Sequence, residues 1–124
     1  MGEGEKDKKM KILTKEVKNT LTDVFNATNC STPLSEHIDE KLTITGYVKF
    51  VDTDSQTGED KEYVGLVCDT GKTISTGSPI FIKAFDTLLD TLSDNNMSII
   101  NGIEIMPVKE TSKGGKDFYN FILC

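Results

Sequence analysis

The sequence predicts an all-β domain with one helix, in which five strands form a small barrel. Three observations support this fold class. Alternation of apolar and polar residues, which is typical of strands, begins at Leu42 and recurs to the end of the chain. A helical period replaces it only once in this region, after Ser78. Polar segments that contain glycine separate the strand-like runs and predict turns between them.

The first three strands are expected before the helix. The longest run alternates β-branched and aromatic residues with polar ones, and Gly46 in its middle predicts a sharp bend of the kind that barrel strands need. A polar connection around Gly58 follows this run, and Thr70-Gly71 forms the next turn. The three expected strands cover residues 42–51, 62–69 and 72–75.

The helix is expected to begin at Ser78-Pro79. Serine caps a helix N-terminus, and proline fits the first turn because its missing N–H has no partner there. Apolar residues then recur at helical spacing as far as Ser93, namely Ile82, Phe85, Leu88, Leu89 and Leu92. Two further strands are expected over 97–109 and 116–124, joined by a turn that contains Gly114 and Gly115.

Three strands, one helix and two strands follow one another in the oligonucleotide-binding (OB) barrel, and we therefore expect that fold. Closure of the barrel removes the free edges that an open stack of hairpins would leave. The chain has 124 residues, which suits one domain. We expect a disordered, charged N-terminus over 1–11, an extension over 12–41 that is a short helix or a loop, and the barrel over 42–124.

The charge balance argues against a nucleic-acid partner, because the net charge is −6 and the pI is about 4.7. It does not exclude one, since affinity depends on the local field of a single groove. The acidic residues are unevenly distributed and concentrate in the segments 52–62 and 86–94. A groove lined by lysine is therefore expected to lie away from both segments.

The cysteines favour a reducing compartment. Cys30, Cys68 and Cys124 are odd in number and far apart, and no C-x-x-C pair occurs. Cys68 is expected in the core of a strand. No apolar run approaches the ~18 residues of a membrane span, and the N-terminus lacks the apolar region of a signal peptide. We expect a cytoplasmic protein with no membrane partner.

No catalytic or metal-binding constellation is apparent. His37 is the one histidine, and we expect it to be a solvated loop residue. The acidic run 52–60 places Thr57 where a calcium loop needs glycine. Gly114-Gly115 lacks the order of a phosphate loop and precedes a strand. We therefore predict a protein that is not an enzyme and has no metal or other cofactor.

The strand faces carry the combination that single-strand binders use, namely aromatic rings beside lysines. Tyr47 and Tyr63 are the preferred stacking residues because each lies on the less apolar face of its expected strand. Lys49 follows Tyr47 on the same face and would contact phosphate. In the last strand, Phe118 is preferred over Phe121, which shares its face with more apolar residues.

The stretch from Thr111 to Leu123 resembles the C-terminal hairpin of small phage single-stranded DNA-binding proteins, in which a Ser/Lys/Gly turn leads into an aromatic-rich last strand. The segment 69–78 resembles the strand–turn–strand that leads into their helix, and the resemblance covers about residues 40–124. It implies an OB barrel that coats single-stranded DNA during phage replication, in the host cytoplasm, without catalysis. By position it places Lys113 and Lys116 near phosphates.

The resemblance also places Phe118 or Tyr119 near bases. This chain departs from the pattern of the family in two ways. The chain has no tryptophan, and its first forty or so residues have no counterpart, so oligomerisation stays open. The complete expected interface is Tyr47, Lys49, Tyr63, Lys72, Lys113, Lys116, Phe118 and Tyr119.

Two function classes follow from the sequence. The first is a protein that binds single-stranded DNA without sequence specificity, with a second copy of itself or replication proteins as further partners. The alternative is an acidic OB-like interaction module, such as an inhibitor, a DNA mimic or a structural component, which does not bind nucleic acid. An enzyme is disfavoured because no catalytic constellation is present.

Overall fold

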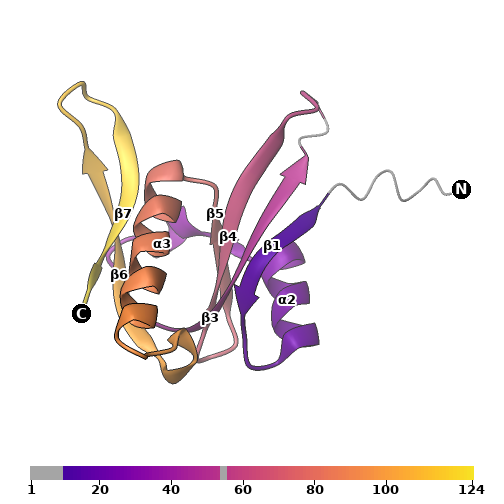
Figure 1. The fold of residues 1–124 in the computed structure, drawn as a ribbon. Coiled ribbons are helices and arrows are strands. Elements are labelled where there is room, and N and C mark those ends of the chain that lie inside the picture. The colour runs from indigo at the N-terminus through magenta and orange to yellow at the C-terminus, as the bar shows by residue number, and fades with distance from the viewer. Residues whose placement is uncertain (1–9, 54–55) are drawn as a thin grey trace, which may run out of the picture.

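The computed structural model describes residues 10–53 and 56–124 and has one curled, mostly antiparallel sheet with two helices (Figure 1). The strands are β1 (Lys11–Glu16), β2 (Thr32–Pro33), β3 (Leu42–Thr53), β4 (Asp60–Cys68), β5 (Thr73–Thr76), β6 (Ile103–Thr111) and β7 (Asp117–Leu123). The helices are α2 (Thr20–Asn29) and α3 (Pro79–Asp94), and the short 3₁₀ turns are η1 (Leu34–His37) and η2 (Ile99–Asn101). The prediction of a mostly β, barrel-like fold is confirmed at this level.

The sheet has the order β2-β5-β4-β3-β6-β7, and β1 pairs with β3 beside that path. One edge of β3 has two partners, because its first residues, Leu42–Ile44, pair with β6 and its later residues, Tyr47–Val51, pair with β1. The sheet therefore splits along β3 and curls around α3 (Figure 1). No pairing joins β7 to β5 in the described part of the chain, so the sheet forms a half-barrel with an open seam.

The N-terminal extension contains more regular structure than the sequence predicted. The expectation of a disordered segment over 1–11 is wrong at Lys11, where β1 begins, and residues 1–9 lie outside the described residues. Beyond β1, the extension contains α2, which was one of the two expected outcomes, the two-residue strand β2 and the turn η1. Pairing with β3 stabilises β1, and no local sequence pattern predicts that pairing.

β3 contains a bulge at the position where the sequence predicted a bend. The register with β4 shifts between Ile44 and Gly46. A Cβ atom on Gly46 would lie 2.9 Å from the backbone oxygen of Glu16, so only glycine fits where the chain leaving β1 crosses. The bulge reverses the alternation of faces: Ile44 and Tyr47 both point into the main core, and Val48 points to the opposite face.

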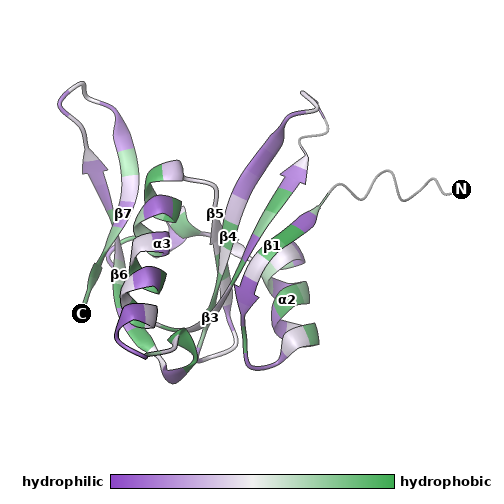
Figure 2. Ribbon diagram, in the orientation of Figure 1, coloured by the Kyte–Doolittle hydropathy of each residue, from purple (hydrophilic) through white to green (hydrophobic). Residues whose placement is uncertain are grey.

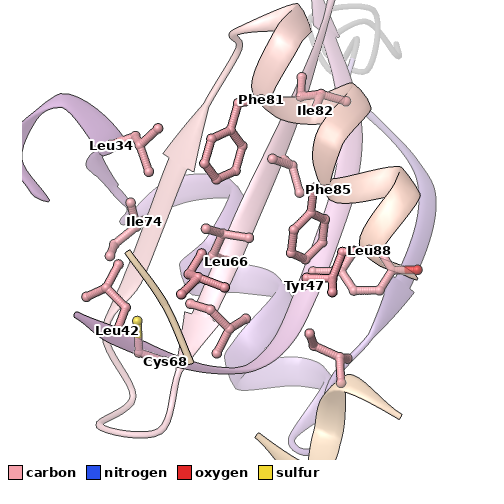
Figure 3. Close-up of a cluster of buried hydrophobic side chains, with 14 of the residues drawn as sticks. Leu34, Leu42, Tyr47, Leu66, Cys68, Ile74, Phe81, Ile82, Phe85 and Leu88 are labelled. Carbon is pink, nitrogen blue, oxygen red and sulfur yellow. The ribbon is translucent and has the colours of Figure 1, made fainter. Parts of the chain in front are cut away.

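The main core lies between α3 and the concave face of the sheet (Figure 3). α3 begins as predicted, because the Ser78 side chain accepts a hydrogen bond from the Phe81 amide and Pro79 occupies the first turn. Its apolar face buries Phe81 and Phe85 among residues of all the barrel strands. The ring of Phe81 also lies 5.1 Å from that of Phe121 in β7, so the helix holds the last strand in place.

A smaller core lies on the convex face, where α2 packs on the sheet. Ala27, Val48 and Phe50 form its buried centre. A Cβ atom on Gly65 would lie 2.9 Å from the Cβ atom of Ala27, so the helix rests directly on the β4 backbone. The N-terminal extension is therefore an integral layer of the fold.

The three cysteines are free thiols, and Cys68 is buried in the main core as expected. Burial raises the pKa of the Cys68 thiol to about 11, so this thiol stays protonated near neutral pH. Cys30 and Cys124 are exposed. Neither helix of the described chain is long and apolar enough to cross a membrane.

Candidate nucleic-acid interface

Two hairpins and the start of α3 frame one end of the molecule. The β3–β4 and β6–β7 hairpins extend to the same side, past the N-terminus of α3, which lies between them (Figure 1). The projecting arms are largely hydrophilic (Figure 2). The open seam of the half-barrel reaches the surface at this end, where one hollow lies at the seam and two further hollows lie beside it.

The central hollow brings together two of the predicted stacking residues. It has a volume of about 320 Å³, and its lining includes Tyr63 from β4 and Tyr119 from β7 together with Pro33, Ser75 and Gly77. It forms because β5 ends at Thr76 and leaves the space between β4 and β7 without a strand. The two tyrosines lie 56 positions apart in the sequence, and the curl of the sheet brings both to the same hollow.

The ring of Tyr63 has a defined orientation. It stacks on Phe50 with 5.5 Å between ring centroids and 18° between ring planes. The ammonium of Lys61 lies 5.6 Å from its centroid, a cation–π distance. A Cβ atom on Gly77 would lie 3.0 Å from the ring, so the backbone there contacts it directly. Tyr63 is therefore a half-buried ring held beside a positive charge.

The second hollow, of about 410 Å³, adjoins the first at Gly77 and extends toward α3. Its lining contains both signs of charge: Lys49, Lys61, Lys83, Asp60, Glu62 and Asp86. Lys61 and Lys83 were not among the residues predicted from the sequence. Lys61 lies two residues before Tyr63 on the same strand face, and that spacing is the signal that identifies it.

Lys49 is neutralised by carboxylates rather than directed at solvent. Its Nζ atom lies 2.8 Å from Asp86 and 3.1 Å from Glu62, and its side chain is 16% exposed. Burial alone would lower the pKa of Lys49, but the hydrogen bonds to the two carboxylates outweigh it and raise the pKa above its usual 10.5. The contact of Lys49 with phosphate stays a prediction, and it would require these two ion pairs to break.

Tyr47 is a core residue, and its prediction as a stacking platform is wrong. Its side chain is 7% exposed and its ring packs edge-on against Phe85, with 5.6 Å between centroids (Figure 3). Its hydroxyl lies 3.2 Å from the Thr14 hydroxyl of β1. The bulge in β3 is the cause, because it turns Tyr47 onto the face of Ile44.

The β6–β7 hairpin presents its lysines as expected, at an exposed tip. Lys113 and Lys116 flank a turn in which the Ser112 hydroxyl accepts a hydrogen bond from the Lys116 amide. Phe118 is half-buried and, by strand alternation, lies on the face opposite Tyr119. Lys72 lies in the turn between β4 and β5, at the opposite end of β4 from the hairpin tip, so the structure does not bring it to the seam.

His37 is not the solvated loop residue that was expected. It is 8% exposed, with Nε2 at 2.8 Å from the Thr32 hydroxyl and Nδ1 at 2.5 Å from a Glu40 oxygen. The hydrogen bond with His37 lowers the pKa of Glu40 below its usual 4.5. The three groups hold the segment before β3 against β5, and none of the hollows along the seam includes the histidine. The described residues also contain no cluster of metal-ligating side chains.

Comparison of the chain with protein-family models, with curated proteins and with solved structures finds no match. The assignment of a function therefore depends on the geometry of the seam.

Proposed function

We propose that this protein binds single-stranded DNA along the open seam, with bases stacked against tyrosine and phosphates near the lysines of the rim. The observation that carries this proposal is that Tyr63 and Tyr119 line the same open hollow. The hollow offers two aromatic rings from separate strands, and Lys61 lies over one of them. Aromatic rings beside a cation are typical of sites where bases stack. As the sequence resemblance implies, the role would be to coat replication intermediates without catalysis.

The proposed fold family is the OB barrel. In support, the strands that follow Leu42 are arranged β5-β4-β3-β6-β7, and α3 connects the third of them to the fourth. OB barrels are partly open and bind oligonucleotides on the face and loops that correspond here to β4, β5 and the two long hairpins. β1, β2 and α2 would be additions to that barrel on its convex side and at its seam.

The charge distribution supports this site in spite of the net negative charge. On one side of the seam, Lys113 and Lys116 lie at the exposed tip of the β6–β7 hairpin. On the other side, Lys61 and Lys83 line the hollow next to Tyr63. A single strand that follows the seam would pass between these two groups, so its phosphates would meet lysine on both sides.

Alanine at Tyr63 or Tyr119 is expected to weaken binding of a labelled ~30-nucleotide oligo-dT by about 1–3 kcal/mol each, the usual contribution of a stacked base. Fluorescence anisotropy measures the affinity, and thermal unfolding verifies that each variant is folded. Phe25→Ala is the matched control, because this ring is 57% exposed on α2 and lines none of the hollows. Equal affinity of the three variants and the unchanged protein would contradict the proposed stacking site.

The lysines of the hairpin tip are expected to contribute to the affinity by contacting the negatively charged phosphates of the bound strand. Replacing both Lys113 and Lys116 with glutamine should reduce the slope of log affinity against log salt by about 1.4, because each single-strand phosphate contact adds about 0.7. Lys72→Gln is the control, since Lys72 lies in the turn at the far end of β4. A slope that changes as much with the control as with the pair would argue against contact at this tip.

A second candidate is an interaction module with a cationic protein partner. The composition of the β3–β4 hairpin favours it, because acidic residues outnumber lysines there and the ammonium of Lys49 is already paired with Glu62 and Asp86. In that case oligo-dT does not bind even at low salt. Reversal of the charge at Asp52, Glu59 and Asp60 would then abolish binding of the partner.

A further inference from the structure

The third hollow, which lies beside the seam under the end of α2, differs from the other two in its size and in the chemistry of its rim. It measures about 180 Å³ and lies between the C-terminus of α2 and the β3–β4 hairpin. It shares Ser31, Tyr63 and Ser75 with the central hollow, so a strand bound there reaches it directly. Drug-sized ligands occupy roughly 300–1,000 Å³, so this volume suits one flat ring system and not a whole nucleotide.

The walls of this hollow are aromatic and flat. The stacked rings of Phe50 and Tyr63 form one side, and Ala27 closes another. Phe50 is itself 5% exposed, so it supports Tyr63 from beneath, and Tyr63 supplies the accessible ring. A planar, aromatic ligand is the class that such walls favour.

Three polar side chains of the rim, Thr28, Asn29 and Ser31, already use their donors within the protein. The Thr28 hydroxyl donates to the Val24 carbonyl at 2.8 Å, and the Ser31 hydroxyl donates to the Ala27 carbonyl at 2.8 Å. The Asn29 amide nitrogen donates to the Phe25 carbonyl and to the Thr28 hydroxyl, both at 3.0 Å, which leaves the amide oxygen as the free end of that side chain. Each of these groups therefore meets a ligand mainly with oxygen lone pairs.

Asp52 adds a carboxylate to the same rim. An ionised carboxylate only accepts hydrogen bonds, and one of its oxygens already accepts the Thr53 amide at 2.9 Å. This carboxylate therefore attracts N–H groups and repels carbonyl oxygens, whereas the Tyr63 and Ser75 hydroxyls of the same rim can donate or accept. Among nucleobases, cytosine, adenine and guanine carry an exocyclic amino group, whereas thymine and uracil present carbonyl oxygens in its place.

We propose that this hollow is a nucleobase pocket that prefers bases with an exocyclic amino group, and that Asp52 sets the preference. The inference rests on the proposed function, since it places one base of the bound strand beside Tyr63. Binding would then be non-specific along most of the seam and selective at one position. The amino group of such a base would donate a hydrogen bond to the Asp52 carboxylate, whereas uracil would place its O4 oxygen against that carboxylate.

The test compares oligo-dC with oligo-dU of equal length at one salt concentration and neutral pH, by competition against labelled oligo-dT. The two bases differ at the ring edge, where cytosine has an amino group and uracil a carbonyl oxygen. The unchanged protein is expected to bind oligo-dC roughly tenfold more tightly, the discrimination usual for one well-placed base contact. In Asp52→Asn, which keeps the shape and the bond to Thr53, the ratio should fall to near one while the affinity for oligo-dU is kept or rises.

The matched control is Asp60→Asn, which removes the same charge from the β3–β4 hairpin but lines the neighbouring hollow. It should alter both affinities alike and leave the ratio unchanged. Equal binding of oligo-dC and oligo-dU by the unchanged protein would overturn the inference and leave the proposed function intact, as would a preference that survives in Asp52→Asn. Absence of binding to any of the oligonucleotides would instead refute the proposed function, and this inference with it.

Discussion

Replacement of Phe85 by alanine is expected to lower the free energy of unfolding by about 3–5 kcal/mol, the range for truncation of a fully buried aromatic residue. Phe85 is 1% exposed and lies at the centre of the main core. Its ring contacts Tyr47 of β3 and Phe121 of β7, at centroid distances of 5.6 and 6.3 Å. The cavity would therefore open between the helix and both sides of the half-barrel, where the neighbouring elements cannot collapse together.

Chemical denaturation followed by circular dichroism measures this loss. The control is Asp90→Ala, an exposed position on the same helix, which should change the stability by less than about 0.5 kcal/mol. A loss below about 1 kcal/mol for Phe85→Ala would mean that α3 does not pack in the sheet as described.

Gly46→Ala is expected to lower the stability by about 1–3 kcal/mol, the usual cost of overpacking. The added methyl group would lie 2.9 Å from the Glu16 carbonyl oxygen and 3.2 Å from a methyl group of Val17. Neither atom moves easily, since Glu16 belongs to β1 and is paired with Tyr47. The substitution should therefore displace the end of β1 from β3.

Gly114→Ala provides the matched control for this substitution. In the β6–β7 turn, an added methyl group approaches only the Ser112 hydroxyl, at 4.0 Å, and the backbone of Gly114 is not in the left-handed region. That variant should be neutral or more stable by up to about 1 kcal/mol, because alanine reduces the freedom of the unfolded chain. Equal effects at the two glycines, measured by the same denaturation experiment, would show that the crossing at Gly46 is not a rigid contact.

The elements after Leu42 could be predicted because their signals are local. The period of the apolar residues and the cap at Ser78 specify α3 almost to the residue. The fourth expected strand was too long at its start, since residues 99–101 form the turn η2 and β6 begins only at Ile103. β1 could not be predicted, because a short, mostly exposed strand is stabilised by its partner and not by its own pattern.

The candidate site was predicted in part, and the missing part has a definite cause. Tyr47 and Lys49 were assigned to the outer face by strict alternation along β3, which the bulge at Thr45 interrupts. Sequence reveals that a glycine bends a strand, but not whether the bend adds a residue to one side of the ladder. Tyr63 and Tyr119 both line the seam, and their meeting depends on long-range curvature that no local pattern contains.

β1 and β6 pair with different parts of one edge of β3, and they protect these parts unequally against local opening. β1 is mostly exposed and buries little apolar surface, whereas β6 is anchored by the buried side chains of the main core. Local fluctuations release segments with few buried contacts long before the whole domain unfolds. The amides of β3 that face β1 therefore belong to a weaker cooperative unit than those that face β6. A transient departure of β1 would leave an unpaired strand edge on an otherwise native molecule, and such an edge is the usual starting point for association between copies of a chain.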